Sequence, residues 1–221
     1  MGGGTAEEGT WPWQVAFRLK EGFKLFCGGT IVSKKFVLSA AHCFEQVRER
    51  HIFVTAGHVA KVWNIYSYCI LCTKKIKGMQ RAAKEDGFQV QKIDKIIVHQ
   101  SYNPDVIYSD IALARVKEKW EWTDYIQPAC LPETNFHAAD GAVCAITGWG
   151  KTDSNKDYLN QATIPLVNFG RCRKQLEYAV KDHTQFCAGL ERGGVDTCQG
   201  KFKYNSLRKI SLYFYIYFKY F

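Results

Sequence analysis

The chain has 221 residues, 47% of them hydrophobic, with nine cysteines and a formal net charge of +9. This length and composition suit one compact globular unit, or two small barrels that share a core. The charge is unevenly placed, because residues 61–84 hold six basic residues and residues 201–221 hold five, with no acidic residue in either segment. Setting these eleven aside leaves 19 basic and 21 acidic residues. A nucleic-acid partner needs a basic face on a folded scaffold, so we expect none.

Neither end of the sequence carries a membrane signal. Met1-Gly-Gly-Gly lacks the basic start and the apolar core of a signal peptide. The strongly apolar stretch Ile210–Phe221 has twelve residues and contains Lys219. It is too short to cross a bilayer, so the sequence predicts no membrane span.

In chain order, the sequence shows short β-prone runs separated by Gly, Pro and Asn. Many short strands of this kind indicate an all-β sandwich or barrel. One later segment, Asn168–Tyr178, begins with an N-cap residue and continues with helix formers, so it predicts a short helix. The predicted strands are Gln14–Leu19, Gly28–Ser33, Ile52–Ala56, Gln89–His99, Ile111–Val116 and Ala142–Thr147.

Six motifs occur along the chain in a fixed order. They are Trp11-Pro-Trp-Gln-Val15, Cys27-Gly-Gly-Thr with Leu38-Ser-Ala-Ala-His-Cys43, Tyr108-Ser-Asp-Ile-Ala-Leu113, Ile126-Gln-Pro-Ala-Cys-Leu-Pro132, Ile146-Thr-Gly-Trp-Gly150 and the run from His183 to Gly200. One short motif is weak support, but six in order resemble the chymotrypsin/trypsin family of serine endopeptidases. The resemblance implies two six-stranded antiparallel β-barrels. It covers residues 1–200 as a peptidase domain, with an insertion at about 61–84.

The resemblance also assigns roles to four residues. His42 matches the general base, and Asp110 matches the carboxylate that orients it. Gly200 matches one donor of the oxyanion hole, and Asp196 matches the residue at the base of a trypsin-like specificity pocket. These matches imply proteolysis after Arg or Lys in a protein or peptide substrate, with no cofactor. We expect no metal site, because the histidines show no metal-ligand spacing and one Cys-x-x-Cys lacks a partner motif.

The nucleophile of this family has no counterpart in the chain. After Gly200 the family continues Asp-Ser-Gly-Gly-Pro, whereas this sequence has Lys201 and Phe202. Lys201 and Met1 also replace both halves of the ion pair that activates these enzymes. We therefore expect an inactive chain; the alternative is a non-catalytic homologue that acts as a protein-binding module.

The last 21 residues do not resemble the family. Nine of residues 201–221 are aromatic, and this segment takes the place of the last two strands and the C-terminal helix of the second barrel. We expect a truncated second barrel with open sheet edges, which argues against the binding-module alternative. Retained introns are our hypothesis for this tail and for the insertion, and a genuine lineage-specific terminus is the alternative.

The odd number of cysteines suits an oxidising compartment with some cysteines unpaired. The resemblance implies the disulfides Cys27–Cys43 and Cys172–Cys187, and it implies secretion of the intact gene product. The remaining cysteines have no assigned partner: Cys69, Cys72, Cys130, Cys144 and Cys198.

Overall fold

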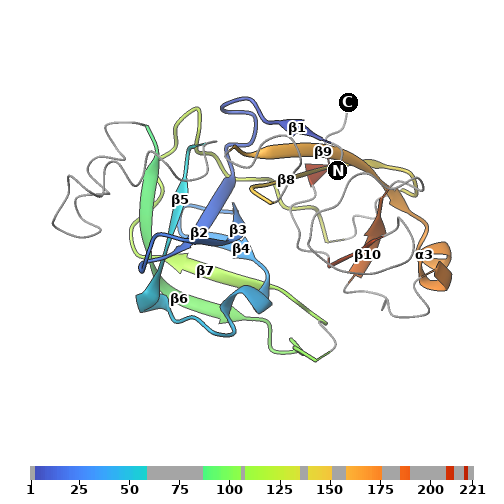
Figure 1. Cartoon of the computed structure of the whole chain (residues 1–221), viewed down its shortest axis with the longest axis horizontal. Helices are drawn as coiled ribbons and strands as arrows, with labels where there is room; N and C mark the ends of the chain where they lie inside the picture. The colour runs from blue at the N-terminus through green and yellow to red at the C-terminus, as the bar shows by residue number, and fades with distance from the viewer. Residues whose placement is uncertain are drawn as a thin grey trace.

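The computed structural model shows two β-rich halves side by side (Figure 1). It describes residues 3–58, 87–105, 108–134, 139–150, 158–175, 185–189, 208–211 and 217–218. The first half is a closed antiparallel barrel, and the second is a sheet with a short helix at its side. The predicted fold class, a trypsin-like double barrel with an incomplete second barrel, is confirmed.

Six strands form the closed barrel in the order β2-β3-β4-β7-β6-β5. Their bounds are β2 Gln14–Leu19, β3 Leu25–Ile31, β4 Phe36–Ser39, β5 Ile52–Ala56, β6 Gln89–Val98 and β7 Ala112–Val116. Two short 3-10 helices, η1 (Ala41–Phe44) and η2 (Glu49–His51), lie between β4 and β5. Closure leaves no strand of this barrel with an unpaired edge.

The interior of the barrel is filled by side chains from every strand. Its core includes Val15 and Phe17 of β2, Val37 of β4 and Val116 of β7, all without solvent exposure. Gly29 is required at one point of this core. A Cβ atom added there would lie 2.7–2.8 Å from three side chains of the neighbouring strands β2 and β4. These side chains can pack against β3 at this point only because Gly29 has no side chain.

The second half is built on β8 (Val143–Gly148) and β9 (Asn160–Val167), which pair along their whole length. The neighbour of β9 is β10 (Gln185–Ala188), and a small apolar core forms between these strands. The helix α3 (Phe169–Gln175) starts where the sequence predicts it, because the Asn168 side-chain oxygen accepts a hydrogen bond from the Arg171 amide at 3.1 Å. Residues 176–178 of the predicted helix lie outside the described residues.

Segments of the tail pair with both outer strands of this sheet. β11 (Arg208–Ser211) pairs with β10, and β12 (Tyr217–Phe218) pairs with β8. The expectation of open edges is therefore wrong for β10, and for Cys144 and Ala145 of β8. An aromatic and β-branched segment supplies the backbone donors and acceptors that any strand can supply, so pairing does not need the family sequence.

The N-terminal segment joins the two halves. β1 (Gly4–Thr5) pairs with β9, and the Ala6 amide donates to the Leu159 carbonyl at 2.8 Å. Trp11 Nε1 donates to Gln161 Oε1 at 2.6 Å. Deep between the halves, the Thr147 hydroxyl donates to Gln14 Oε1 at 2.5 Å. These contacts join residues up to 157 positions apart in sequence, from Gly4 to Gln161, and tie the two halves together.

Four predicted strands have different ends in the structure. β3 ends at Ile31 because the Ser33 hydroxyl accepts from the Phe36 amide at 3.2 Å and closes a turn there. β6 ends at Val98, one residue before the prediction, β7 begins at Ala112, one residue after it, and β8 is displaced by one residue. Among the described residues, the structure contains no helix that is long and apolar enough to span a lipid bilayer.

Candidate active site

The topology of the first barrel brings two distant polar residues together. β4 and β7 are antiparallel neighbours, with Ser39 opposite Ala112 at the end of the pairing. The chain therefore leaves β4 beside the point where it enters β7. His42 follows β4, within η1, and Asp110 precedes β7 by two residues. Sixty-eight residues of sequence separate them, yet His42 Nδ1 lies 2.7 Å from Asp110 Oδ2.

Asp110 is held in a buried turn. The Ile111 amide bonds the Ser109 carbonyl at 2.7 Å, which closes a tight turn around Asp110 and places Ser109 at φ 50°. The Asp110 side chain is 1% exposed. Its Oδ1 accepts from the His42 amide at 2.9 Å, and the Ala41 amide also bonds this carboxylate.

These backbone bonds make Asp110 a cap for η1. Ala40, the residue before that helix, provides no side-chain cap, so the first amides of η1 take their acceptor from a distant strand end. Burial pushes the pKa of Asp110 upward, but the bonds from His42 and from the two amides outweigh burial and lower it. Asp110 is therefore a stable buried anion beside an imidazole.

The contact with Asp110 fixes the tautomer of the neutral His42 ring. Because the carboxylate is an acceptor, the proton of the neutral ring lies on Nδ1 and the lone pair lies on Nε2. The bond to Asp110 raises the pKa of His42, burial opposes this, and the charges of Asp110 and Glu45 raise it further. The side chain is 41% exposed, so the ring is accessible from solvent.

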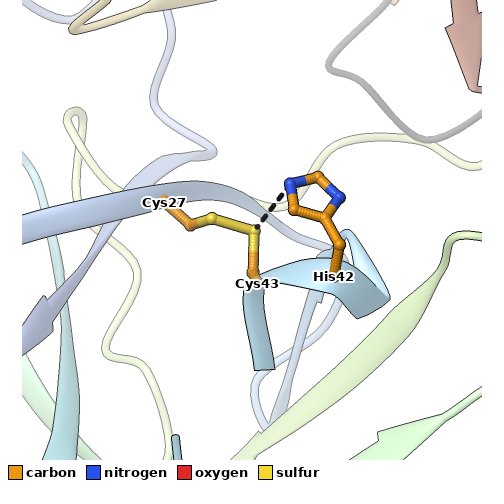
Figure 2. A group of neighbouring side chains, drawn as sticks. All are labelled: Cys27, His42 and Cys43. Carbon is orange, nitrogen blue, oxygen red and sulfur yellow. Dashed lines mark hydrogen bonds between the residues drawn. A yellow bond between two sulfur atoms is a disulfide. The ribbon is translucent and has the colours of Figure 1, made fainter. Parts of the chain in front are cut away.

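A disulfide bond fixes the floor beneath this ring. Cys27 of β3 and Cys43 of η1 are joined, and Figure 2 shows the His42 ring lying over the Cys43 sulfur. His42 Nε2 lies 3.8 Å from Cys43 Sγ. A disulfide sulfur has no proton to donate, so this contact becomes a weak hydrogen bond only when Nε2 is protonated.

The same three side chains superficially resemble a metal site, since their ligand atoms lie within 4.8 Å of one another. Both sulfurs are consumed by the disulfide, however, and a thiolate is the form that binds metals. The group fits a structural disulfide next to a base better than it fits a metal ligand set.

Two neighbours of His42 were not predicted from the sequence. The Tyr102 hydroxyl donates to Glu45 Oε1, and burial together with this bond raises the pKa of Tyr102. Glu45 follows η1 directly, so it places a negative charge next to His42. No motif marks either residue, because their pairing depends on where the segment after β6 returns to the site.

The other predicted site residues lie outside the described residues: Asp196, Gly200 and positions 201–202, where the nucleophile would be. The same holds for the insertion and for Cys69, Cys72 and Cys198. The second predicted disulfide, Cys172–Cys187, is present and joins α3 to β10. Among the described cysteines, Cys130 is exposed and free, while Cys144 is buried and free. Burial raises the pKa of the Cys144 thiol to about 11, so it stays protonated.

Comparison with known proteins agrees with this arrangement. The family model described as Trypsin matches residues 1–201. A protein named ovochymase, from Halocynthia roretzi, is 32% identical over 212 residues. That match covers 90% of this chain and 12% of the relative's length, so the chain spans a small part of the protein it resembles.

Proposed function

The chain belongs to the trypsin family of serine endopeptidases, and from this premise we propose that His42 and Asp110 are the base and the orienting carboxylate of a protein-cleaving site. The observation that supports this most strongly is the 2.7 Å contact between His42 Nδ1 and the buried Asp110 carboxylate. A carboxylate in that place keeps the proton of the neutral ring on Nδ1. It also stabilises the imidazolium that forms when Nε2 takes a proton from a nucleophile.

The pKa shifts are consistent with this role. Proton uptake by His42 is favoured because Asp110 raises its pKa, and Asp110 remains ionised because its own pKa is lowered. The negative charge therefore sits beside the ring before the reaction starts, and no reorganisation is needed when the ring becomes charged.

The sequence as it stands lacks the group that would give up that proton. Lys201 and Phe202 follow Gly200, where the family has Asp and the nucleophilic Ser. In this family the amide of that Ser is also the second oxyanion donor beside Gly200. Loss of one such donor typically lowers the rate by about a hundred- to a thousandfold, and here the nucleophile is lost as well. We propose that this chain has no peptidase activity.

A site completed with a family C-terminal segment would cleave after Arg or Lys. Asp196 lies six positions before the missing Ser, and a buried carboxylate at the base of the pocket would pair with the cation of the substrate. An apolar substrate side chain would leave that carboxylate unpaired, which is costly in a dry pocket. We further propose that the intact gene product is secreted, which suits two disulfides in the first 200 residues.

We propose domain limits of 1–200 for the peptidase domain, with an insertion at about 61–84, and 201–221 for a separate tail. The match to the family model over residues 1–201 supports this boundary. Sequencing the transcript across the Gly200 codon tests whether the tail is intronic. An uninterrupted exon through that codon would contradict the intron hypothesis.

The activity itself is tested with a fluorophosphonate probe and an Arg-ester substrate. We expect neither labelling nor turnover in the full chain. A chimaera in which residues 201–221 are replaced by a family segment starting Asp-Ser-Gly-Gly-Pro, with an Ile-Val start released by cleavage, should react and should prefer Arg and Lys. Labelling of the original chain that disappears in His42→Ala would refute its inactivity. Indifference of the chimaera to Asp196→Ser would refute the pocket assignment.

A further inference from the structure

Five lysines lie near one another on the first barrel. The turn between β3 and β4 carries Lys34 and Lys35, and the segment after β7 carries Lys117 and Lys119. Lys35 Nζ donates to the Lys117 carbonyl at 2.5 Å, and the Lys117 amide donates to the Lys92 carbonyl at 2.8 Å. These contacts bring the β3–β4 turn, the segment after β7 and the first half of β6 to one surface.

A sixth lysine lies farther along the barrel wall. Lys20 follows β2, at the end of β3 opposite the turn that carries Lys34 and Lys35. Lys92 links it to the other lysines, because the pKa of Lys20 is lowered first by burial and then by the charge of Lys92. We call Lys20, Lys34, Lys35, Lys92, Lys117 and Lys119 the lysine surface.

The lysines of this surface are not neutralised within the part of the chain that the structure describes. The salt bridges found there are His42–Asp110 and Arg115–Asp94. Glu118 and Glu121 lie on the same surface, which leaves a local excess of four positive charges over these eight residues. The protein body is nearly neutral as a whole, but this surface carries a local excess of positive charge. Like charges held together in this way attract anions.

An open hollow of about 630 Å³ lies within the lysine surface. Its lining includes Lys34, Lys35 and Lys119, and also Val90 and Trp120. Val90 and Trp120 are 3% and 1% exposed, so apolar contact in the hollow comes mainly from the aliphatic stems of the lysines beside their ammonium groups. A volume of this size is within the range of small-ligand sites and can hold a few amino-acid residues of a peptide.

Two buried polar atoms of the lining residues lack a hydrogen-bond partner. They are Gln91 Oε1 and Trp120 Nε1, on side chains 7% and 1% exposed. A buried polar group without a partner costs about 1–3 kcal/mol. One is an acceptor and the other is a donor, which is the pair that a peptide group satisfies through its N–H and its C=O after a small movement of these side chains.

We propose that the lysine surface and its hollow bind an acidic, extended polypeptide segment. The paired donor and acceptor and the apolar lining favour a peptide over a sulfated polysaccharide. Glu118 and Glu121 interrupt the lysines and would repel a uniformly charged polyanion, whereas a peptide can place neutral residues opposite them. This binding needs no nucleophile, so it goes beyond the proposed function and does not depend on it.

The test is fluorescence anisotropy of the full chain with a labelled dodecapeptide in which Glu alternates with Gly and Leu. Its matched control is the same peptide with Gln in place of Glu. We expect the acidic peptide to bind and the Gln peptide to bind at least about tenfold more weakly, with binding lost near 1 M salt, where the screening length is about 3 Å. Lys119→Glu should weaken binding about three- to tenfold.

The control variant is Lys174→Glu, which makes the same charge change at an exposed position of α3, away from the first barrel (Figure 1). It should leave binding within about twofold. An equal loss in both variants would show a net-charge effect and overturn the proposal. A heparin fragment that binds more tightly than the peptide would also overturn it, in favour of a polysaccharide site, as would the absence of any peptide binding.

Discussion

Replacement of Asp110 by Asn separates the charge of this residue from its shape. The carboxylate accepts from His42 Nδ1 at 2.7 Å and from the His42 amide at 2.9 Å. In the variant, one side-chain oxygen can still cap η1, but the amide NH₂ then faces Nδ1 and cannot accept its proton. We expect the ring to change tautomer so that Nδ1 becomes the acceptor. We also expect the pKa of His42 to fall from its raised value, because the hydrogen bond and the charge of Asp110 are gone while burial still lowers it and only the charge of Glu45 still raises it.

The loss of folding stability should depend on pH. The raised pKa of His42 stabilises the fold fully below pH 6.5, and this contribution disappears as the pH rises through the raised value. The lowered pKa of Asp110 stabilises the fold above pH 3.8, and this is lost as the pH falls through the lowered value. Both contributions are fully present between pH 3.8 and 6.5. Hydrogen bonds to charged groups contribute about 1.5–3 kcal/mol to stability, and the variant loses them. The variant also no longer buries a charge at this position, which offsets part of that loss. The net destabilisation should be about 1–3 kcal/mol at pH 5 and smaller at pH 9.

Two measurements check this prediction. Proton NMR of the histidine Cε1–H signals, with His42 assigned by a His42→Gln spectrum, gives the pKa. Urea denaturation followed by tryptophan fluorescence at pH 5 and pH 9 gives the stability. Asp94→Asn is the control, because it removes an ion pair in which both side chains are 44% exposed, and it should cost less than about 1 kcal/mol. An unchanged pKa of His42 in Asp110→Asn, or the same destabilisation at both pH values, would refute the reasoning.

Two further predictions concern the first barrel. Gly29→Ala should destabilise the fold by about 1–3 kcal/mol in thermal denaturation, because its methyl group would lie 2.7–2.8 Å from core side chains. Gly150→Ala, with no atom within 4 Å of the added group, should change stability much less; equal effects would contradict the packing argument. The double variant Cys27→Ala with Cys43→Ala should lose about 3 kcal/mol in urea denaturation, because the disulfide closes a loop of 16 residues. A loss below about 1 kcal/mol would show that the disulfide does not stabilise the fold.

The sequence predicts the bounds of a barrel strand correctly when the strand's own residues determine where it begins and ends. β2 and β5 have the predicted bounds, since each is a run of β-formers bounded by turn residues. The start of β3 is predicted less accurately. Its first residues precede two glycines, but they still pair with β2. That pairing is a tertiary contact, and local propensity does not report it.

The candidate site shows the same division. His42 and Asp110 were found because their motifs are local, but the bonds from the Ala41 and His42 amides to Asp110 depend on the alignment of β4 with β7. Tyr102 and Glu45 carry no motif of their own and meet only in the folded chain. The strand pairing of the tail was missed for a related reason, since backbone pairing depends on an available edge rather than on a family sequence.

The docking of β1 on β9 sets an order for synthesis on the ribosome. Gly4 and Thr5 are synthesised about 155 residues before their partners Gln161 and Asn160. At about 5–20 residues per second, β1 waits roughly 8–30 s before its partner strand exists. The barrel strands from β2 to β7 are synthesised before then, so they can pair while β1 is still undocked. Any factor that captures β1 during the delay would act before the two halves can close on each other.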